Sequence, residues 1–186
     1  NLRKSGKMVN FRPLCFTSYV IAVPKGNPAN ITNIEDLTRP GVRVAMALEA
    51  SAPGGQAVMG ILKAADITGK VLANVREQGS CVQRSVADVT EGKADAMIVE
   101  RRICRMARFA DKLEYVEIPE RLFPAGPLTF TVGMMANAAD PAKATAYMDW
   151  ITSAQGQEYF ETAGFIPAIS PKGMELVEKL GVKDVA

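Results

Sequence analysis

Apolar runs alternate with segments of helical spacing along most of the chain. Residues 17–23 are rich in β-branched and aromatic residues, which favours a buried strand. A short strand begins at Val42, and residues 56–65 then carry apolar side chains close to helical spacing. The continuous apolar run at 94–100 is typical of a strand covered on both faces. Because strands and helices alternate, we predict an α/β fold with a parallel-rich sheet and flanking helices over residues 20–119.

Several helix ends are marked by capping residues. Residues 71–76 suggest a further strand, after which Ser80 can cap a helix that ends at Gly92. Asp140 precedes a proline at the first position of another helix, and Ser153 begins the next one. The last third of the chain is therefore predicted to be mainly helical.

The composition argues against several classes of function. The 186 residues carry 22 Lys and Arg against 20 Asp and Glu, so the net charge of +2 provides no broad basic field for nucleic acid. The chain has no histidine, which excludes Ser-His and Cys-His nucleophilic pairs and the commonest transition-metal ligand. Cys15, Cys81 and Cys104 are odd in number and widely spaced, so we predict free, buried thiols. We predict no metal site and no cofactor.

A loop of small residues, ALEASAPGGQAV at 47–58, stands between a predicted strand and a predicted helix. A plain strand-to-helix turn is one interpretation. A cradle for a small anion is the other, because a helix N-terminus has unpaired N–H donors and about half a positive charge. The residues of the loop alone leave both interpretations open.

Three segments resemble, in order, the periplasmic molybdate- and tungstate-binding proteins of ABC importers. YVIAVPKGNPANITNIEDLTRPGVRVAM resembles their hinge strand and the segment after it. EGKADAMIVE is similar to a late strand of their second lobe, and MDWITSAQGQEYFETAGFIPA resembles their C-terminal helix pair. The resemblance covers about residues 17–169. It implies the type II periplasmic-binding-protein fold, in which two α/β lobes close on a ligand.

The resemblance also implies a domain organisation. Residues 1–16 would lead into the hinge, 17–136 would form a complete second lobe, and 137–186 would return to a partial first lobe. Within the second lobe, 18–23 and 128–135 would lie side by side as hinge strands. Because family members begin with a first half-lobe that this chain does not show, we expect its C-terminal helices to find a partner by homodimerisation or segment exchange.

The resemblance carries a set of ligand-binding residues onto this chain. Those residues are Ser51, Ala52, Gly54, Cys81, Val82 and Glu100. Pro53 has no N–H, so Ser51, Ala52 and Gly54 are the expected donors of the first loop. The backbone of Cys81 and Val82 would face the ligand from a second helix N-terminus, although Ser80 capping its own helix remains an alternative.

Glu100 stands where the molybdate proteins often have a tyrosine that donates to the oxyanion. At about 4 Å and an effective dielectric constant near 20, a like-charge pair costs roughly 4 kcal/mol. Glu100 would therefore pair with Arg101 or Arg102 and turn away, or be protonated, or the ligand would not be a dianion. A solvated glutamate beside a basic helix is the other interpretation. Arg101, Arg105 and Arg108 share one helical face, which we interpret as solvated.

The resemblance implies a non-enzymatic solute-binding component of an ABC importer. It would capture a molybdate- or tungstate-like oxyanion in the periplasm or another extracytoplasmic space and present it to a membrane permease. Two alternatives remain, namely the ligand-sensing domain of a transcription regulator and an enzyme on the same scaffold, since a fold does not fix a function.

Overall fold

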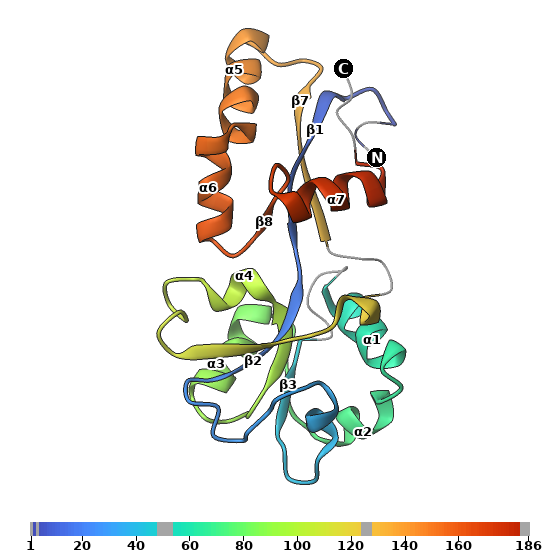
Figure 1. Cartoon of the computed structure of the whole chain (residues 1–186), viewed down its shortest axis with the longest axis vertical. Coiled ribbons are helices and arrows are strands. Elements are labelled where there is room, and N and C mark those ends of the chain that lie inside the picture. Colours follow the sequence, from blue (N-terminus) through green and yellow to red (C-terminus); the bar gives the residue numbers. More distant parts are fainter. Residues whose placement is uncertain (1, 3, 48–53, 124–127, 183–186) are drawn as a thin grey trace. The chain divides into compact units, whose positions relative to one another are not determined.

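The structure is a computed structural model that falls into two compact units. It describes residues 2, 4–47, 54–123 and 128–182. Unit 1 combines residues 1–17 with 128–186, and unit 2 comprises residues 18–127. Figure 1 shows their elements along the chain.

Unit 2 is built on short strands with helices on both sides. Its strands are β2 (Tyr19–Pro24), β3 (Val44–Met46), β4 (Val75–Gln78), β5 (Met97–Glu100) and β6 (Leu113–Glu117). β2 lies between β5 and β6 and runs antiparallel to both. β3 pairs with β4 in parallel, and Val44 forms a parallel bridge to Ala96 just before β5.

The prediction of a parallel-rich sheet over residues 20–119 is therefore wrong in part, since the central strand is antiparallel to both neighbours. Five of the six residues of β2 are buried. This burial is what the apolar run indicated, because a strand covered on both faces reads as continuously apolar. An apolar run reports which faces are covered and carries no information on strand direction.

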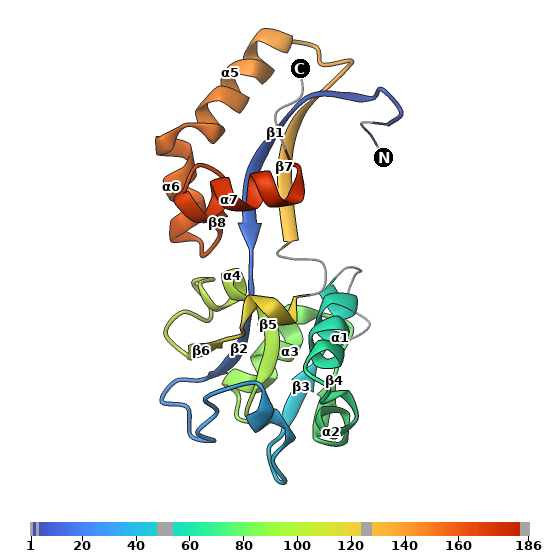
Figure 2. The same ribbon diagram turned by 45° about the vertical axis from the view of Figure 1, so that its right-hand side comes forward.

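The helices of unit 2 are mostly short. They are α1 (Gly54–Ala64), α2 (Thr68–Ala73), α3 (Val82–Thr90) and α4 (Arg101–Cys104), with 3₁₀ turns η1 (Glu35–Thr38) and η2 (Glu120–Leu122). Figure 1 shows α1 and α2 on one side of β3 and α3 on the other, and Figure 2 shows α1 above α2. Part of the predicted strand at 71–76 is helical, and the predicted basic helix after Glu100 has only one turn. An apolar cluster that includes Val20, Val86 and Val99 holds α3 and α4 on the sheet.

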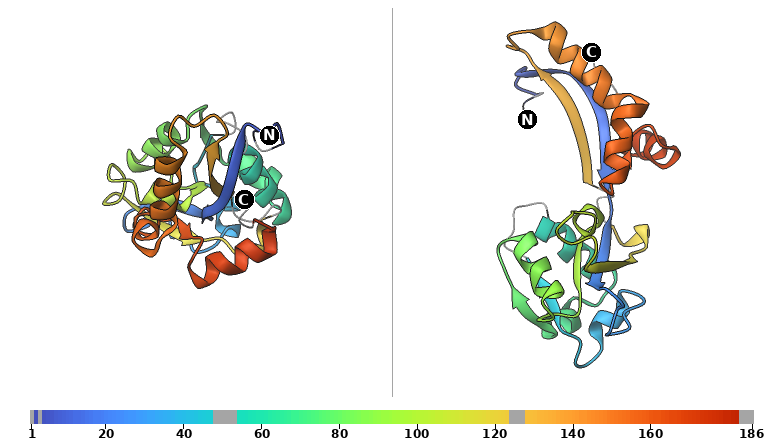
Figure 3. Two further views of the ribbon diagram at one scale, coloured as in Figure 1. Left: turned by 90° about the horizontal axis from the view of Figure 1, so that it is seen from above. Right: turned by 90° about the vertical axis from the view of Figure 1, so that its left-hand side faces the viewer.

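Unit 1 contains a long antiparallel strand pair. Its strands are β1 (Met8–Thr17), β7 (Leu128–Met135) and β8 (Ile166–Pro167), in the order β7-β1-β8. Figure 3 shows β1 and β7 as a curved pair with α5 and α6 beside it. The predicted pairing of 128–135 with 18–23 is wrong, since β7 pairs with β1. Arg12 and Pro13 interrupt the apolar pattern of β1, and its pairing register with β7 shifts on both sides of them. The strand was therefore not predicted from the sequence.

Three capped helices complete unit 1. They are α5 (Pro141–Thr152), α6 (Ala154–Thr162) and α7 (Pro171–Leu180). The predicted caps Asp140 and Ser153 are confirmed, because their side chains accept hydrogen bonds from backbone N–H groups. Phe16, Ala168 and Leu176 form a small core between β1 and α7. None of the helices in the described ranges has the length and apolar character needed to span a membrane.

Candidate functional site

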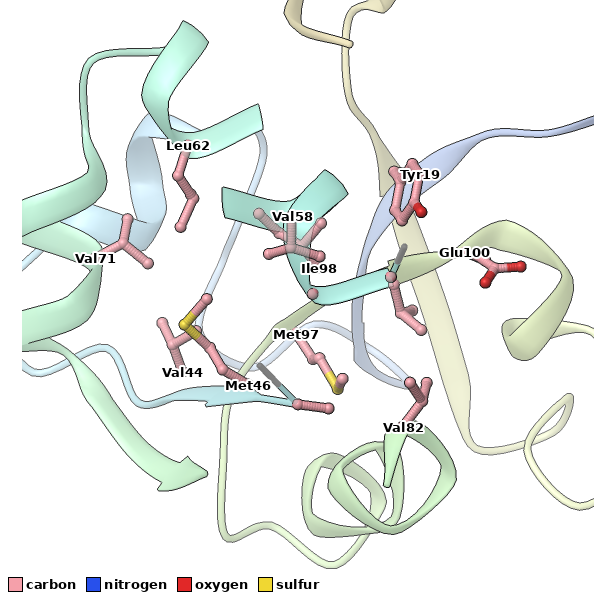
Figure 4. Close-up of a pocket in the computed structure, with 14 residues that line it drawn as sticks. Tyr19, Val44, Met46, Val58, Leu62, Val71, Val82, Met97, Ile98 and Glu100 are labelled. Atoms are coloured by element: carbon pink, nitrogen blue, oxygen red, sulfur yellow. The ribbon is translucent and has the colours of Figure 1, made fainter. Parts of the chain in front are cut away.

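A pocket in unit 2 brings several predicted site residues together. Strands β2, β3 and β5 and the first turns of α1 and α3 line it (Figure 4). Its walls are largely apolar and include Val44, Met46, Val58, Leu62, Met97 and Ile98. The cavity is small, at about 30 Å³.

The first turn of α1 opens onto this pocket. Gly54 and Gly55 both line it, so the backbone approaches the enclosed space without a side chain in between. The N–H groups in the first turn of a helix have no intrahelical partner, and the helix dipole places partial positive charge there. Gly54, one of the predicted ligand contacts, lines the pocket, whereas Ser51 and Ala52 lie outside the described residues.

The first turn of α3 reaches the same pocket through Val82. The N-cap residue of α3 is Cys81, whose side chain makes no capping hydrogen bond. The prediction that Ser80 caps this helix is therefore wrong. Cys81 is exposed, which corrects the prediction that all three thiols are buried. Cys104 is buried, and this burial raises the pKa of its thiol to about 11. The start of α3 therefore has no side-chain cap from Cys81, and Val82, not Cys81, lines the pocket.

Glu100 lines the pocket at the end of β5, but its carboxylate is paired. Arg102 Nε lies 2.5 Å from Glu100 Oε2, and the Glu100 side chain is 16% exposed. Figure 4 shows the carboxylate directed away from the apolar walls. Of the arrangements considered for Glu100, the structure shows the one in which Arg102 neutralises it.

Sequence analysis missed Tyr19, which lies directly opposite Glu100 in the β2–β5 pairing and also lines the pocket. The residue is 3% exposed, and its ring packs edge-on against Phe123 with centroids 6.1 Å apart. Burial, and secondarily the charge of Glu100, raise the pKa of Tyr19 to about 12, against a smaller opposing effect of Arg102. Tyr19 was taken only as part of an apolar strand, because one sequence does not show strand register.

The site is built for binding. Its described lining brings the first residues of α1 and α3 together with one phenol and one paired carboxylate. Among the residues that the structure describes, no three His, Cys, Asp or Glu side chains gather as a metal site would require. A small anion that enters the pocket meets donors and positive helix ends, so the arrangement can hold an anion without a cationic side chain.

Comparison with known proteins identifies the family of this chain. The profile of a family described as bacterial extracellular solute-binding protein matches residues 1–166. The molybdate-binding protein ModA of Mycobacterium bovis is 32% identical over 147 residues, which are 78% of this chain and 52% of that protein. A sulfate-binding protein of Synechococcus elongatus is 24% identical over 174 residues, which are 86% of this chain and 49% of that protein.

The fold is shared with solved structures. The substrate-binding domain of a candidate molybdenum ABC transporter from Clostridium difficile superposes with a TM-score of 0.73 at 20% identity, over 89% of this chain and 71% of that one. This likeness confirms the predicted type II periplasmic-binding-protein fold. The chain spans about half the length of the curated relatives it matches. The family resemblance predicted from the sequence is confirmed, and the chain belongs to the bacterial extracellular solute-binding protein family.

Proposed function

We propose that the protein is the solute-binding component of an ABC importer and that it captures a small oxyanion of the molybdate type. The observation that carries this proposal is the meeting of two helix N-termini at one small pocket, with Gly54 and Gly55 on one side and Val82 on the other. Two positive helix ends that face one space favour an anion and disfavour a cation. The protein performs no chemistry on its ligand.

The relatives narrow the class of ligand. One relative is named a molybdate-binding protein and another a sulfate-binding protein, and both ligands are compact tetrahedral dianions. The pairing of Glu100 with Arg102 removes most of the repulsion that an unpaired carboxylate would exert on a dianion.

The proposed site residues are those that the family resemblance carries onto this chain. We assign ligand contacts to the backbone of Gly54, Cys81 and Val82, and to Ser51 and Ala52; of these, Gly54 and Val82 line the pocket. Glu100 borders the site without bonding the anion. We assign unit 2 to the second lobe of the fold and unit 1 to a part of the first lobe. In this family fold, a ligand favours the closed form because only there do both lobes contact it.

The proposed partner is the membrane permease of the importer, and the proposed compartment is periplasmic or extracytoplasmic. Self-association stays a prediction that concerns α5 and α6. Tyr147, Trp150 and Tyr159 are exposed there. The ring centroid of Trp150 lies 6.1 Å from that of Tyr147 and 6.0 Å from that of Tyr159. Sedimentation of the protein over a range of concentrations tests it, and a monomer at every concentration contradicts it.

Titration calorimetry of the full-length protein with molybdate, tungstate and sulfate tests the proposed ligand class. We expect binding of at least one of these dianions, with an affinity that depends little on salt compared with a surface site, because the pocket is buried. The absence of binding for all three anions would overturn the proposal.

The substitution Glu100→Gln tests the assigned role of the carboxylate. Because Arg102 already neutralises Glu100, the change in binding free energy should stay below about 1 kcal/mol. A sharp gain in affinity would mean that Glu100 faces the anion unpaired. Loss of binding would mean that the carboxylate accepts from the ligand, which would then carry donors or positive charge.

A further inference from the structure

Tyr19 and Glu100 both line the pocket. They are register partners in the antiparallel pairing of β2 with β5, so their side chains leave the sheet on the same face. Figure 4 shows them on the same side of the pocket. The start of β2 is fixed, because the Arg101 backbone N–H donates to the Ser18 carbonyl over 2.9 Å.

The Tyr19 hydroxyl is buried and has no hydrogen-bond partner among the described residues. A buried hydroxyl without a partner costs about 1–3 kcal/mol, so such groups are rare unless something outside the chain satisfies them. Phe123 packs edge-on against the ring, and Tyr19 is only 3% exposed, so its hydroxyl is shielded from solvent. Because Tyr19 lines the pocket, a group that enters the pocket can be that partner.

The chemistry of that group follows from the phenol. The pKa of Tyr19 is raised to about 12, so the side chain is neutral at any physiological pH and keeps its proton. A neutral phenol can donate one hydrogen bond, and it adds no negative charge to a site that faces two helix N-termini. The orphaned hydroxyl and these helix ends therefore favour the same occupant, an acceptor that carries negative charge.

We propose that the Tyr19 hydroxyl donates a hydrogen bond to the bound oxyanion and supplies the side-chain donor that position 100 does not provide. Glu100 has no proton to give when it is ionised, and Arg102 holds its carboxylate. β2 provides the donor one strand away, at the position paired with Glu100. This inference rests on the proposed oxyanion function and names a binding residue within it.

The substitution Tyr19→Phe removes the hydroxyl and keeps the ring. We expect the affinity for the dianion that the wild-type protein binds best among molybdate, tungstate and sulfate to fall roughly ten- to hundredfold. Thermal stability without ligand should stay the same or rise, because the change deletes an unsatisfied buried hydroxyl. Tyr115→Phe is the matched control, since Tyr115 packs on the core of the same unit but does not line the pocket. It should leave the affinity unchanged.

A second measurement reports the hydrogen bond itself. Addition of the same anion should shift the near-ultraviolet absorption of tyrosine in the wild-type protein and in Tyr115→Phe, and the shift should disappear in Tyr19→Phe. If the wild-type protein binds and Tyr19→Phe binds equally well, the role of Tyr19 is overturned and the proposed function stands. If the wild-type protein binds none of the three anions, both are overturned.

Discussion

The two units treat the N-termini of their helices in opposite ways. In unit 1, the side chains of Asp140, Ser153 and Ser170 accept hydrogen bonds from the first turns of α5, α6 and α7 over 3.0–3.3 Å. In unit 2, the described N-cap residues of α2, α3 and α4 make no such bond. A side-chain cap satisfies one of the orphan N–H groups of a helix, and its absence leaves that group for another acceptor.

We interpret the missing cap at α3 as leaving its first N–H groups for a ligand. Capped helices gain about 1 kcal/mol each from their own sequence. The start of α3 lacks that gain, and Val82 in its first turn lines the pocket. If this interpretation is right, changes at helix starts in unit 1 should alter stability alone, and changes at the start of α3 should alter binding.

The largest effect is expected where α7 meets β8 in unit 1. A Cβ at Gly173 would lie 1.9 Å from the Pro167 carbonyl oxygen, so Gly173→Ala must displace backbone. We expect a loss of about 3 kcal/mol or more in the free energy of unfolding of unit 1. Trp150, the single tryptophan, lies in α5 and reports this transition by fluorescence.

Gly69→Ala in α2 is the control for that experiment. A Cβ at Gly69 would meet nothing within 4 Å, so the change should cost nothing or add up to about 1 kcal/mol of stability to unit 2. Equal losses for both substitutions would show that the two units do not differ in this way. An unchanged tryptophan transition in Gly173→Ala would contradict the tight packing of α7.

The second effect concerns binding at α3. Cys81→Asp would place a carboxylate at the N-cap, where it stabilises the helix by roughly 0.5–2 kcal/mol. The same carboxylate would compete for the N–H donors and repel a dianion. A like-charge pair at 4 Å costs about 4 kcal/mol at an effective dielectric constant of 20, so the affinity should fall at least about a hundredfold.

Cys81→Ser separates the two causes, because a serine caps the helix without charge. Its effect on affinity should be at most about tenfold. Calorimetry with molybdate, together with thermal unfolding, measures both quantities. Increased stability with unchanged affinity in both variants would show that the start of α3 takes no part in binding.

The sequence predicted features that depend on local physics. Asp140 and Ser153 are caps because a short polar side chain before a helical pattern acts within one turn. The pairing of β7 with β1 was missed because it joins residues far apart in sequence, and Arg12 and Pro13 break the pattern of β1. The type II fold was predicted through the order of resembling segments, which carries long-range information that periodicity lacks.

The site was predictable to the same extent. Gly54 and Val82 were proposed through the family resemblance, supported by two local signals, a loop of small residues and a helix start, and both line the pocket. Tyr19 was not found, since its role depends on its pairing with Glu100 and on the burial of its hydroxyl. Both are properties of the folded chain.

The third effect is the difference in stability contributed by two ion pairs, each of which has a shortest N–O distance of 2.6 Å. Arg43–Asp95 lies in unit 2, where the Asp95 side chain is 15% exposed, and Arg12–Asp149 lies in unit 1, where the Asp149 side chain is 59% exposed. Asp95 also accepts from the backbone N–H of Arg43. Asp95→Asn should therefore cost about 1–2 kcal/mol and Asp149→Asn less than about 1 kcal/mol.

The free energy of unfolding, measured as the pH is lowered, checks the contribution of the Arg43–Asp95 ion pair. Burial tends to raise the pKa of Asp95, but the hydrogen bonds and charge of Arg43 outweigh it and hold the pKa below 3.8. Stability from a carboxyl with a lowered pKa is present above its unfolded pKa and is lost as the pH falls through its folded pKa. The stability curves of the wild type and Asp95→Asn should converge as the pH drops below 3.8. A constant difference down to that range would mean that the ion pair is not the cause.

The smallest effect is expected at the caps of unit 1 themselves. Ser170 accepts from the Gly173 N–H over 3.0 Å, and its own hydroxyl donates to the Pro167 carbonyl over 2.8 Å. Ser170→Ala removes both bonds and should lower the stability of unit 1 by about 1 kcal/mol, while Ser170→Asp should retain the cap of α7. Anion affinity should not change in either variant, because Ser170 belongs to the unit that does not contain the pocket. Hydrogen exchange in the first turn of α7 measures the loss locally, and calorimetry with molybdate measures the affinity. A clear drop in affinity on Ser170→Ala would show that the caps of unit 1 also control the site and would end the division between scaffold helices and ligand-facing helices.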